Sequence, residues 1–358
     1  MNRTQLRCFG VIGLLLWIFC PSRGFAENEL QFDDIVQMLE HPGKQFNYLG
    51  TKFVVDYTPA RRSTTLVKIT YAASGLEKKE VSPLQSGESQ IILDDGKFLW
   101  HYIPSQASVI KKKRRLSLGE LSKRIRYQKD LIQQNYVIAI ETPPPEPAVS
   151  DAAQPPSVKG DVMVSLQPKT PDRPAWKIWI VREHGLVVRT EIYDIEGNLA
   201  LLSAFSELTF QPTLPEKSLT MIVPEGTTVK TSVEQNFRTV AEAQTHVSFG
   251  VCEPAYMPPG FILSAVILSK TGDGEKVQLT YIDGMSSISV FEDKRIPAIV
   301  QASKTSKEIA INNTVKGTFH DEGLLKILNW PLRGDVHVTL VGEVADSELL
   351  KIAASITN

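Results

Sequence analysis

The chain has 358 residues, of which 42% are hydrophobic and 22% are charged. This is the composition of a globular protein, and it excludes a disordered, collagen-like or polytopic membrane chain. The length predicts two domains, and a net charge of -1 gives no electrostatic footprint for binding nucleic acid.

The N-terminus has the pattern of a secretory signal peptide. Arg3 and Arg7 precede an apolar run that ends at Cys20, and a proline and small residues follow up to Ala26. The run is too short to span a membrane, so export with cleavage after Ala26 is favoured over a retained anchor. Cys20 follows bulky residues, which argues against lipidation. Cleavage would remove three arginines and two cysteines, and would leave Cys252 without an intramolecular disulfide partner.

Helical spacing of apolar residues predicts a short amphipathic helix from Phe32 to Leu39. From residue 46 onwards apolar and polar residues mostly alternate, which is typical of antiparallel strands joined by hairpins. A capping-box pattern at Ser117 predicts a further helix towards Asn135, and the proline-rich segment 142–157 is predicted to be a mobile excursion. The clearest predicted strands are 53–57, 66–71, 98–102, 162–166, 176–181, 186–193 and 199–210.

Prolines and turn residues between Pro212 and Gln235 predict a boundary between domains. A second capping box at Thr239 predicts a helix that ends before Gly250. A last amphipathic helix is predicted to start at Asp346. Between these helices, strands are predicted at 261–268, 276–281, 286–292 and 336–341.

The sequence contains no motif for catalysis or for a metal site. Its six histidines are isolated from one another, and zinc-ligand spacings, a nucleophile elbow and a P-loop are absent. We therefore predict no catalytic residue, no metal and no cofactor, although single groups can still assemble across a fold.

The densest charged feature is a basic run beside a predicted aromatic strand. The run is either a solvated junction between a strand and a helix, or a docking patch for lipid phosphates or an acidic partner segment. It comprises Lys111, Lys112, Lys113, Arg114 and Arg115.

The aromatic and aliphatic residues of the predicted strands have two possible interpretations. They fill an ordinary core, or they line a cavity for an acyl chain on the concave face of a curved sheet. The candidate pocket residues are Phe53, Val55, Phe98, Trp100, Tyr102 and Trp179.

Several stretches resemble the RseB/MucB family of periplasmic regulators of sigma-E. Residues 47–54 (NYLGTKFV), 95–102 (DGKFLWHY) and 179–210 resemble its N-terminal domain, which has the half-barrel fold of the lipoprotein carriers LolA and LolB. Residues 281–291 (YIDGMSSISVF) resemble the signature of its C-terminal domain, and 341–356 its closing strand and helix. Lys52 and the 142–157 insertion depart from the family pattern.

The resemblance implies an α+β protein with an antiparallel half-barrel sheet covered by helices and a smaller α+β domain. The implied parts are a signal peptide (1–26), a LolA-like lipid-sensing domain (27–212), a linker (213–235) and a partner-binding C-terminal domain (236–358). The candidate residues for partner binding are Tyr281, Asp283 and Phe291.

The implied function is that of a non-enzymatic periplasmic regulator. Such a protein binds the exported segment of a membrane-spanning anti-sigma factor, shields it from proteolysis and releases it when lipid or lipopolysaccharide binds. Release requires that the protein has two arrangements, one favoured by the anti-sigma factor and the other by lipid. We expect these arrangements to differ in the angle between the domains. A homodimer is compatible with this function. The alternative is a periplasmic carrier of lipids or lipoproteins that uses the same cavity.

Overall fold

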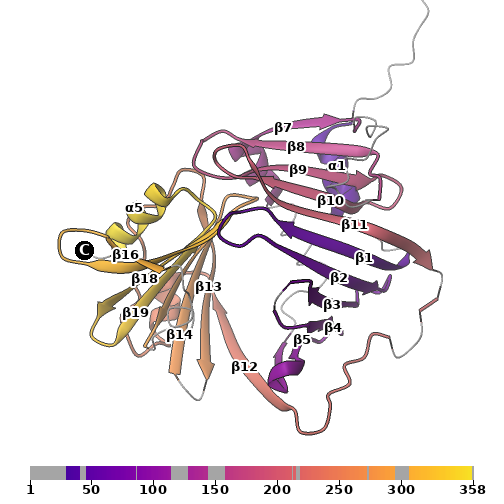
Figure 1. Cartoon of the computed structure of the whole chain (residues 1–358). Coiled ribbons are helices and arrows are strands. Elements are labelled where there is room, and N and C mark those ends of the chain that lie inside the picture. Colours follow the sequence, from indigo (N-terminus) through magenta and orange to yellow (C-terminus); the bar gives the residue numbers. More distant parts are fainter. Residues whose placement is uncertain are drawn as a thin grey trace, which may run out of the picture. The chain divides into compact units, whose positions relative to one another are not determined.

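The fold is that of a computed structural model, described for residues 30–40, 46–85, 87–113, 128–143, 158–211, 213–214, 218–271, 274–294 and 306–356. The predicted signal peptide, Arg114, Arg115 and most of segment 142–157 lie outside these residues. The described residues form an α+β fold of two large sheets with few helices (Figure 1). Within them, no helix is long and apolar enough to cross a membrane.

Sheet A is antiparallel in the order β7-β8-β9-β10-β11-β1-β2-β3-β4-β5-β6. The turn before β5 contains Gly96, whose φ of 85° suits glycine. All seven predicted strand segments between residues 53 and 210 lie in this sheet. Its strands are β1 (Asn47–Asp56), β2 (Ser63–Tyr71), β3 (Glu77–Pro83), β4 (Gln90–Asp94), β5 (Phe98–Ile103), β6 (Ser108–Lys113), β7 (Tyr136–Glu141), β8 (Val162–Pro168), β9 (Ala175–Val181), β10 (Leu186–Tyr193) and β11 (Leu199–Gln211).

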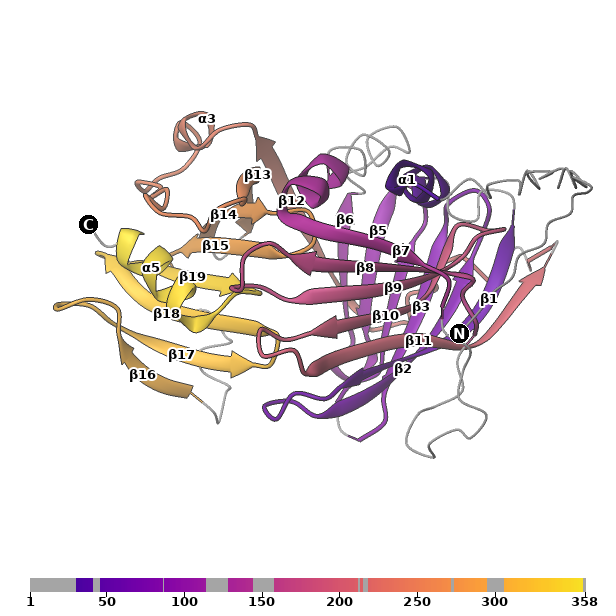
Figure 2. The same cartoon turned by 90° about the horizontal axis from the view of Figure 1, so that it is seen from above.

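Two helices accompany sheet A. The two views show the sheet curving from β7 through β11 and β2 to β5, with α1 (Phe32–Glu40) on its open side (Figure 1, Figure 2). The predicted apolar face of α1 is buried through Ile35 and Val36. A second helix, described at 128–135, buries Leu131, and its Lys129 forms an ion pair with Asp33 of α1 at 3.0 Å. The helix predicted at the first segment is thus present, and so is the end of the second at 128–135, whereas its predicted start at Ser117 lies outside the described residues.

Sheet B has the order β12-β13-β14-β15-β19-β18-β17-β16. One face carries a large apolar core that includes Trp330, Leu340 and Ile352. Helix α5 (Asp346–Ile356) starts as predicted, and a short 3-10 helix (Pro104–Gln106) precedes β6 in the other sheet. The strands are β12 (Thr228–Phe237), β13 (Ile262–Thr271), β14 (Gly274–Ile282), β15 (Ser287–Asp293), β16 (Ser306–Ala310), β17 (Lys316–Glu322), β18 (Leu325–Arg333) and β19 (Val336–Gly342).

Helix α3 (Val240–Gln244) is shorter than predicted. The capping box is present, because the Thr239 hydroxyl accepts a hydrogen bond from the Glu242 N–H at 3.2 Å. The helix ends early because the Gln244 side chain bonds to the backbone of Phe249 and Val251, at 2.8 and 2.7 Å. These bonds hold a returning loop in place of further helical turns.

Strand β12 belongs to both sheets. Its first half pairs in parallel with Ser108–Lys112 of β6, and its second half pairs antiparallel with β13. This strand occupies the second half of the predicted linker 213–235. The sequence there is mostly polar, so it lacks the alternation of apolar and polar residues that would predict a strand. Backbone hydrogen bonds to β6 and β13 stabilise the strand instead.

Candidate functional site

Loops of the two sheets meet within the compact unit that begins at Gln31. We call the described residues of 30–232, with sheet A, the N-terminal lobe, and those of 233–356, with sheet B, the C-terminal lobe. The loop between β8 and β9 and the end of the 128–135 helix lie in the first lobe. They contact the turn between β14 and β15 and the residues that precede β13 in the second.

Arg173 carries the central contact between the lobes. This side chain comes from the loop between β8 and β9 and is 2% exposed. Its Nη1 donates to Asp283 Oδ2 and its Nη2 to the Pro259 carbonyl, both at 2.9 Å, while its Nε donates to Asp172 Oδ1 at 2.8 Å. Burial alone would lower the pKa of Arg173, but the carboxylates of Asp172 and Asp283 raise it above its ordinary value. The buried guanidinium is therefore charged, and each of its three nitrogens donates at least one hydrogen bond.

Asp283 is the acceptor on the C-terminal side and is 0% exposed. Its Oδ2 also accepts the Tyr136 hydroxyl at 2.8 Å, and its Oδ1 accepts the N–H groups of Met285 and Ser286 at 2.9 and 2.7 Å. Burial and the Asp283 charge raise the pKa of Tyr136 well above its usual range, so the phenol remains a donor. Four hydrogen bonds, one of them from the Arg173 cation, thus compensate this carboxylate.

The backbones of the two lobes also approach closely. Asn135 Nδ2 donates to the carbonyls of Gly260 and Asp283, at 3.1 and 2.9 Å. Gly284 has a φ of 107°, and a Cβ there would lie 2.8 Å from the Ile132 nitrogen. A larger residue cannot fit at this position without moving the helix end. We call Asn135, Tyr136, Arg173 and Asp283 the junction cluster.

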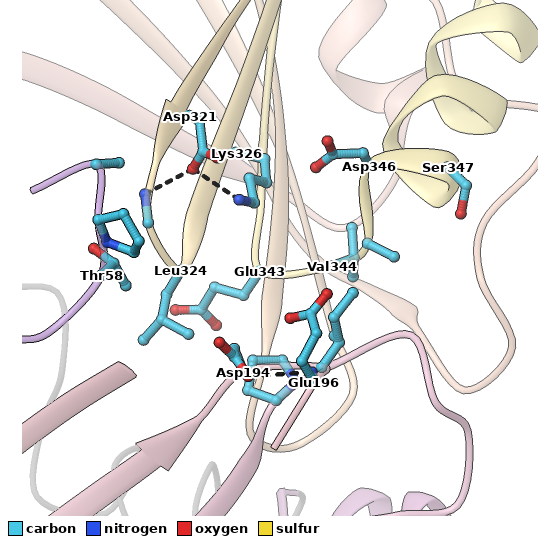
Figure 3. Close-up of a pocket in the computed structure, with 16 residues that line it drawn as sticks. Thr58, Asp194, Glu196, Asp321, Leu324, Lys326, Glu343, Val344, Asp346 and Ser347 are labelled. Atoms are coloured by element: carbon cyan, nitrogen blue, oxygen red, sulfur yellow. Dashed lines mark hydrogen bonds and ion pairs between the residues drawn. The ribbon is translucent and has the colours of Figure 1, made fainter. Parts of the chain in front are cut away.

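Next to the junction cluster lies a cavity of about 630 Å³, which we call the cleft (Figure 3). Both lobes line it through the turns that follow β1, β10 and β17 and through the segment from β19 into α5. Its lining combines carboxylates, one lysine and small apolar surfaces. The charged residues are Asp194, Glu196, Asp321, Lys326, Glu343 and Asp346.

The charges of the cleft are less well compensated than those of the junction cluster. Lys326 Nζ pairs with Asp321 Oδ1 at 2.7 Å. Glu343 accepts the Ser287 N–H at 3.3 Å, and burial, with the nearby Asp283 charge, raises the pKa of Glu343 to about 7. Asp194 accepts N–H groups of its own turn. The lining therefore has a negative potential that favours cations.

The register places all six predicted pocket residues on one face of sheet A, because Trp179 pairs with Arg189, Arg189 with Ala204 and Ala204 with Phe53. The register of β1 to β5 places Phe53 and Val55 on the same face as Phe98, Trp100 and Tyr102. The register also places the ion pair between Lys78 and Glu80, at 2.8 Å, on that face, so the face is not free of charge.

The six residues fall into separate packing groups and do not line the cleft. Phe53 is buried with Leu202 and Ala204, and Val55 packs beside them. Trp179 packs against a different group around Phe205. These contacts are those of a packed sheet, and the choice between core and lipid cavity stays a prediction.

The described lysines of the basic run have different surroundings. Lys111 Nζ lies 3.9 Å from the centre of the Phe98 ring and 4.3 Å from that of Trp100, as in a cation–π contact. Lys112 pairs with Glu234 of β12 at 3.3 Å, whereas Lys113 is exposed. Lys111 and Lys112 therefore have partners inside the chain.

Only one of the three predicted partner-binding residues, Asp283, belongs to the junction cluster; Tyr281 and Phe291 lie within β14 and β15 of sheet B. Asp283 is buried in the junction cluster, Tyr281 is 5% exposed, and Phe291 is half-buried with Lys276 Nζ 5.4 Å from its ring centre. The sequence analysis did not identify Arg173 or the cleft. A signal was present, because an arginine between Asp172 and a proline marks a charged loop, but its partner is 110 residues away.

Among the described residues, no group of three or more His, Cys, Asp or Glu is placed to hold a metal ion. The structure thus offers no metal centre in this part of the chain.

No protein-family model matches the sequence, and no curated protein matches it significantly. Solved structures do share its fold. The crystal structure of MucB in complex with MucA(peri) has a TM-score of 0.52 at 16% identity, and covers 91% of this chain and 98% of its own. The MucA/MucB complex of Pseudomonas aeruginosa has the same score and identity, with coverage of 90% and 96%. The fold of this chain, through both lobes, is therefore similar to that of MucB.

Proposed function

We propose that the chain is a regulator of the RseB/MucB family that binds the exported segment of a membrane-spanning anti-sigma factor and shields it from proteolysis. The observation that carries the proposal is the likeness to MucB over 91% of the chain, in a structure that also contains MucA(peri). The resemblance of residues 281–291 supports it, because this stretch supplies the turn that anchors the two lobes to each other.

The proposal includes the remaining expectations from the sequence. The protein is exported to the periplasm by the signal peptide 1–26 and is not an enzyme. Residues 27–212 form the lipid-sensing domain, 213–235 the linker and 236–358 the partner-binding domain. Lipid or lipopolysaccharide on the first domain lowers the affinity for the anti-sigma factor.

The junction cluster sets an energetic condition on such a release. Any motion that separates the lobes must break the pair between Arg173 and Asp283 and the hydrogen bonds that Tyr136 and Asn135 make across the junction, and hydration of the two separated charges offsets part of this cost. A lipid can supply this energy only through a difference in its affinity for the two arrangements. Release by lobe separation therefore demands a lipid with strong preference for the open form.

A binding and protection experiment tests the proposed function. The mature chain is titrated calorimetrically with the purified exported segment of an anti-sigma factor from the same organism, and the segment is then digested with its initiating protease. We expect binding, slower cleavage, and a reversal of both by lipopolysaccharide. Absence of binding would overturn the proposal, and binding without the reversal would overturn its lipid-release part.

The alternative is a lipid or lipoprotein carrier, favoured by the shared face of the six aromatic and aliphatic pocket candidates. Trp100→Glu places a charge on that face, and Leu99→Glu, at a neighbouring position that is 40% exposed, is the matched control. For a lipid pocket we expect that Trp100→Glu alone loses binding of a fluorescent fatty acid while the fold remains intact. Loss of the fold would show a packed core instead. A carrier would bind lipid tightly, and the anti-sigma segment would not compete.

A further inference from the structure

Four carboxylates of the cleft have no cationic partner among the residues that the structure describes. None of the lysines and arginines that the structure describes forms an ion pair with Asp194, Glu196, Glu343 or Asp346. Figure 3 shows the side chains of Asp194, Glu196 and Glu343 pointing toward one another, although the first two belong to one lobe and the third to the other. Together these acidic side chains give the cleft a negative potential that attracts a cationic ligand.

Part of the remaining lining is apolar and partly exposed. Ile195, between two of the carboxylates, is 44% exposed, and Leu324 extends into the same space from the turn after β17 (Figure 3). Pro59 and Pro174 complete the apolar part on the N-terminal side. An acidic lining with apolar contacts fits a peptide that combines lysine or arginine with apolar residues, rather than a bare cation.

We propose that the cleft binds a basic, extended segment of the anti-sigma factor, whose lysine or arginine side chains neutralise Asp194, Glu196, Glu343 and Asp346. This inference rests on the proposed function and names the chemistry of the partner at one surface. A bound segment contacts both lobes at once, so it also favours the arrangement in which the junction cluster is closed.

Charge reversal at two exposed positions tests the inference. Glu196→Lys with Asp346→Lys reverses two charges of the cleft, and both side chains are exposed. The matched control reverses Glu183 and Asp335, which are exposed in the turns after β9 and β18, at the opposite ends of strands that reach the cleft. Circular dichroism checks the fold of all variants.

Each variant is titrated with two probes at low and high salt. One probe is the exported anti-sigma segment, and the other is a labelled synthetic peptide of lysine, leucine and glycine. We expect the cleft variant to bind both probes at least about tenfold more weakly, because opposed charges become like charges. The control should remain within about twofold, and high salt should reduce the difference.

The outcomes separate this inference from the proposed function. Equal binding of the anti-sigma segment by wild type, control and cleft variant would overturn the cleft and leave the proposed function standing. Binding of the synthetic peptide but not of the anti-sigma segment, with the expected loss in the cleft variant, would overturn the proposed function and leave a cleft for basic peptides. Binding of neither probe by the wild type would overturn both.

Discussion

The junction cluster and the cleft are two acidic regions where the lobes meet. They differ in how fully their carboxylates are compensated by cations and hydrogen-bond donors. Asp283 is fully buried, yet it accepts hydrogen bonds from four donors, one of which is the Arg173 cation. Glu343 is near enough for the Asp283 charge to raise its pKa, but it accepts one long hydrogen bond and faces other carboxylates. The difference teaches that the first region holds the lobes together, whereas the second is completed by a ligand.

The largest effect is expected from removing the cation of the junction cluster. Arg173→Met leaves Asp283 buried without its cation, and we expect the free energy of unfolding to fall by about 3–5 kcal/mol. Urea denaturation of the mature chain measures this loss. Arg182→Met is the control, because Arg182 is an exposed residue of the turn after β9, within one lobe.

A double variant sharpens this result. Asp283→Asn removes the negative charge, so Arg173→Met should cost less in its presence, and the two losses should not add. Additive losses would show that the two side chains act independently, which contradicts a junction built on their pairing.

The next largest effect is expected at the glycine of the junction. Gly284→Ala adds a Cβ that would meet the Ile132 nitrogen at 2.8 Å, at a φ that side chains rarely adopt. We expect a loss of about 3 kcal/mol from strain and overlap together. Gly197→Ala has a similar positive φ but nothing within 4 Å, and should lose about 1 kcal/mol. Equal losses in urea denaturation would show that the contact between the lobes is loose.

The buried carboxylates predict a pH dependence in the opposite direction from ordinary acid denaturation. Burial raises the pKa of Glu343 and of Glu292 to about 7, whereas an unfolded glutamate titrates near 4.5. Between these values the folded state binds more protons, so stability is highest at the acidic end and falls as pH rises towards 7. The free energy of unfolding should therefore fall between pH 5 and 8. We expect the Glu343→Gln variant to lack about 2 kcal/mol of this fall.

Glu292 serves as the comparison for that experiment. It is 0% exposed, accepts the Cys252 N–H at 3.0 Å and lies outside the cleft. A basic peptide in the cleft should abolish the Glu343 part of the pH dependence, because a bound cation lowers its pKa, and should leave the Glu292 part unchanged. A peptide that affects both parts equally would contradict a specific site.

Local patterns predicted much of the fold, and the failures have physical causes. Alternation identified β1, β5 and β11, because one face of each is apolar. Strands such as β16 (Ser306–Ala310) and β17 carry polar residues at most positions and are stabilised by pairing with neighbours rather than by their own pattern. Strand β12 was predicted as linker for the same reason.

The candidate site was less predictable than the fold. Residues 281–291 were selected through a resemblance, and their Asp283 does prove central, but as a contact between lobes rather than as an exposed group. Arg173 and Tyr136 meet it across 110 and 147 residues of sequence. Contacts of this range depend on how complete sheets pack, and composition or spacing within one segment carries no information about them.

The smallest effect on stability is expected inside the cleft, and it gives the sharpest contrast with the junction. Lys326 is 21% exposed and pairs with Asp321, which is 48% exposed, so Lys326→Ala should change the free energy of unfolding by less than about 1 kcal/mol. The same change frees a carboxylate and makes the cleft more negative. Affinity for a lysine-rich peptide should therefore rise, by about threefold at low salt.

Lys316→Ala is the matched control, because Lys316 forms an exposed ion pair with Glu308 at 2.7 Å in the same sheet but away from the cleft. It should alter neither stability nor peptide affinity measurably. If Lys326→Ala were instead strongly destabilising with unchanged affinity, the charges of the cleft would belong to the fold, like those of the junction. A gain in affinity at constant stability would show that the acidic residues where the lobes meet have two roles. Those of the junction cluster stabilise the fold, and those of the cleft bind a ligand.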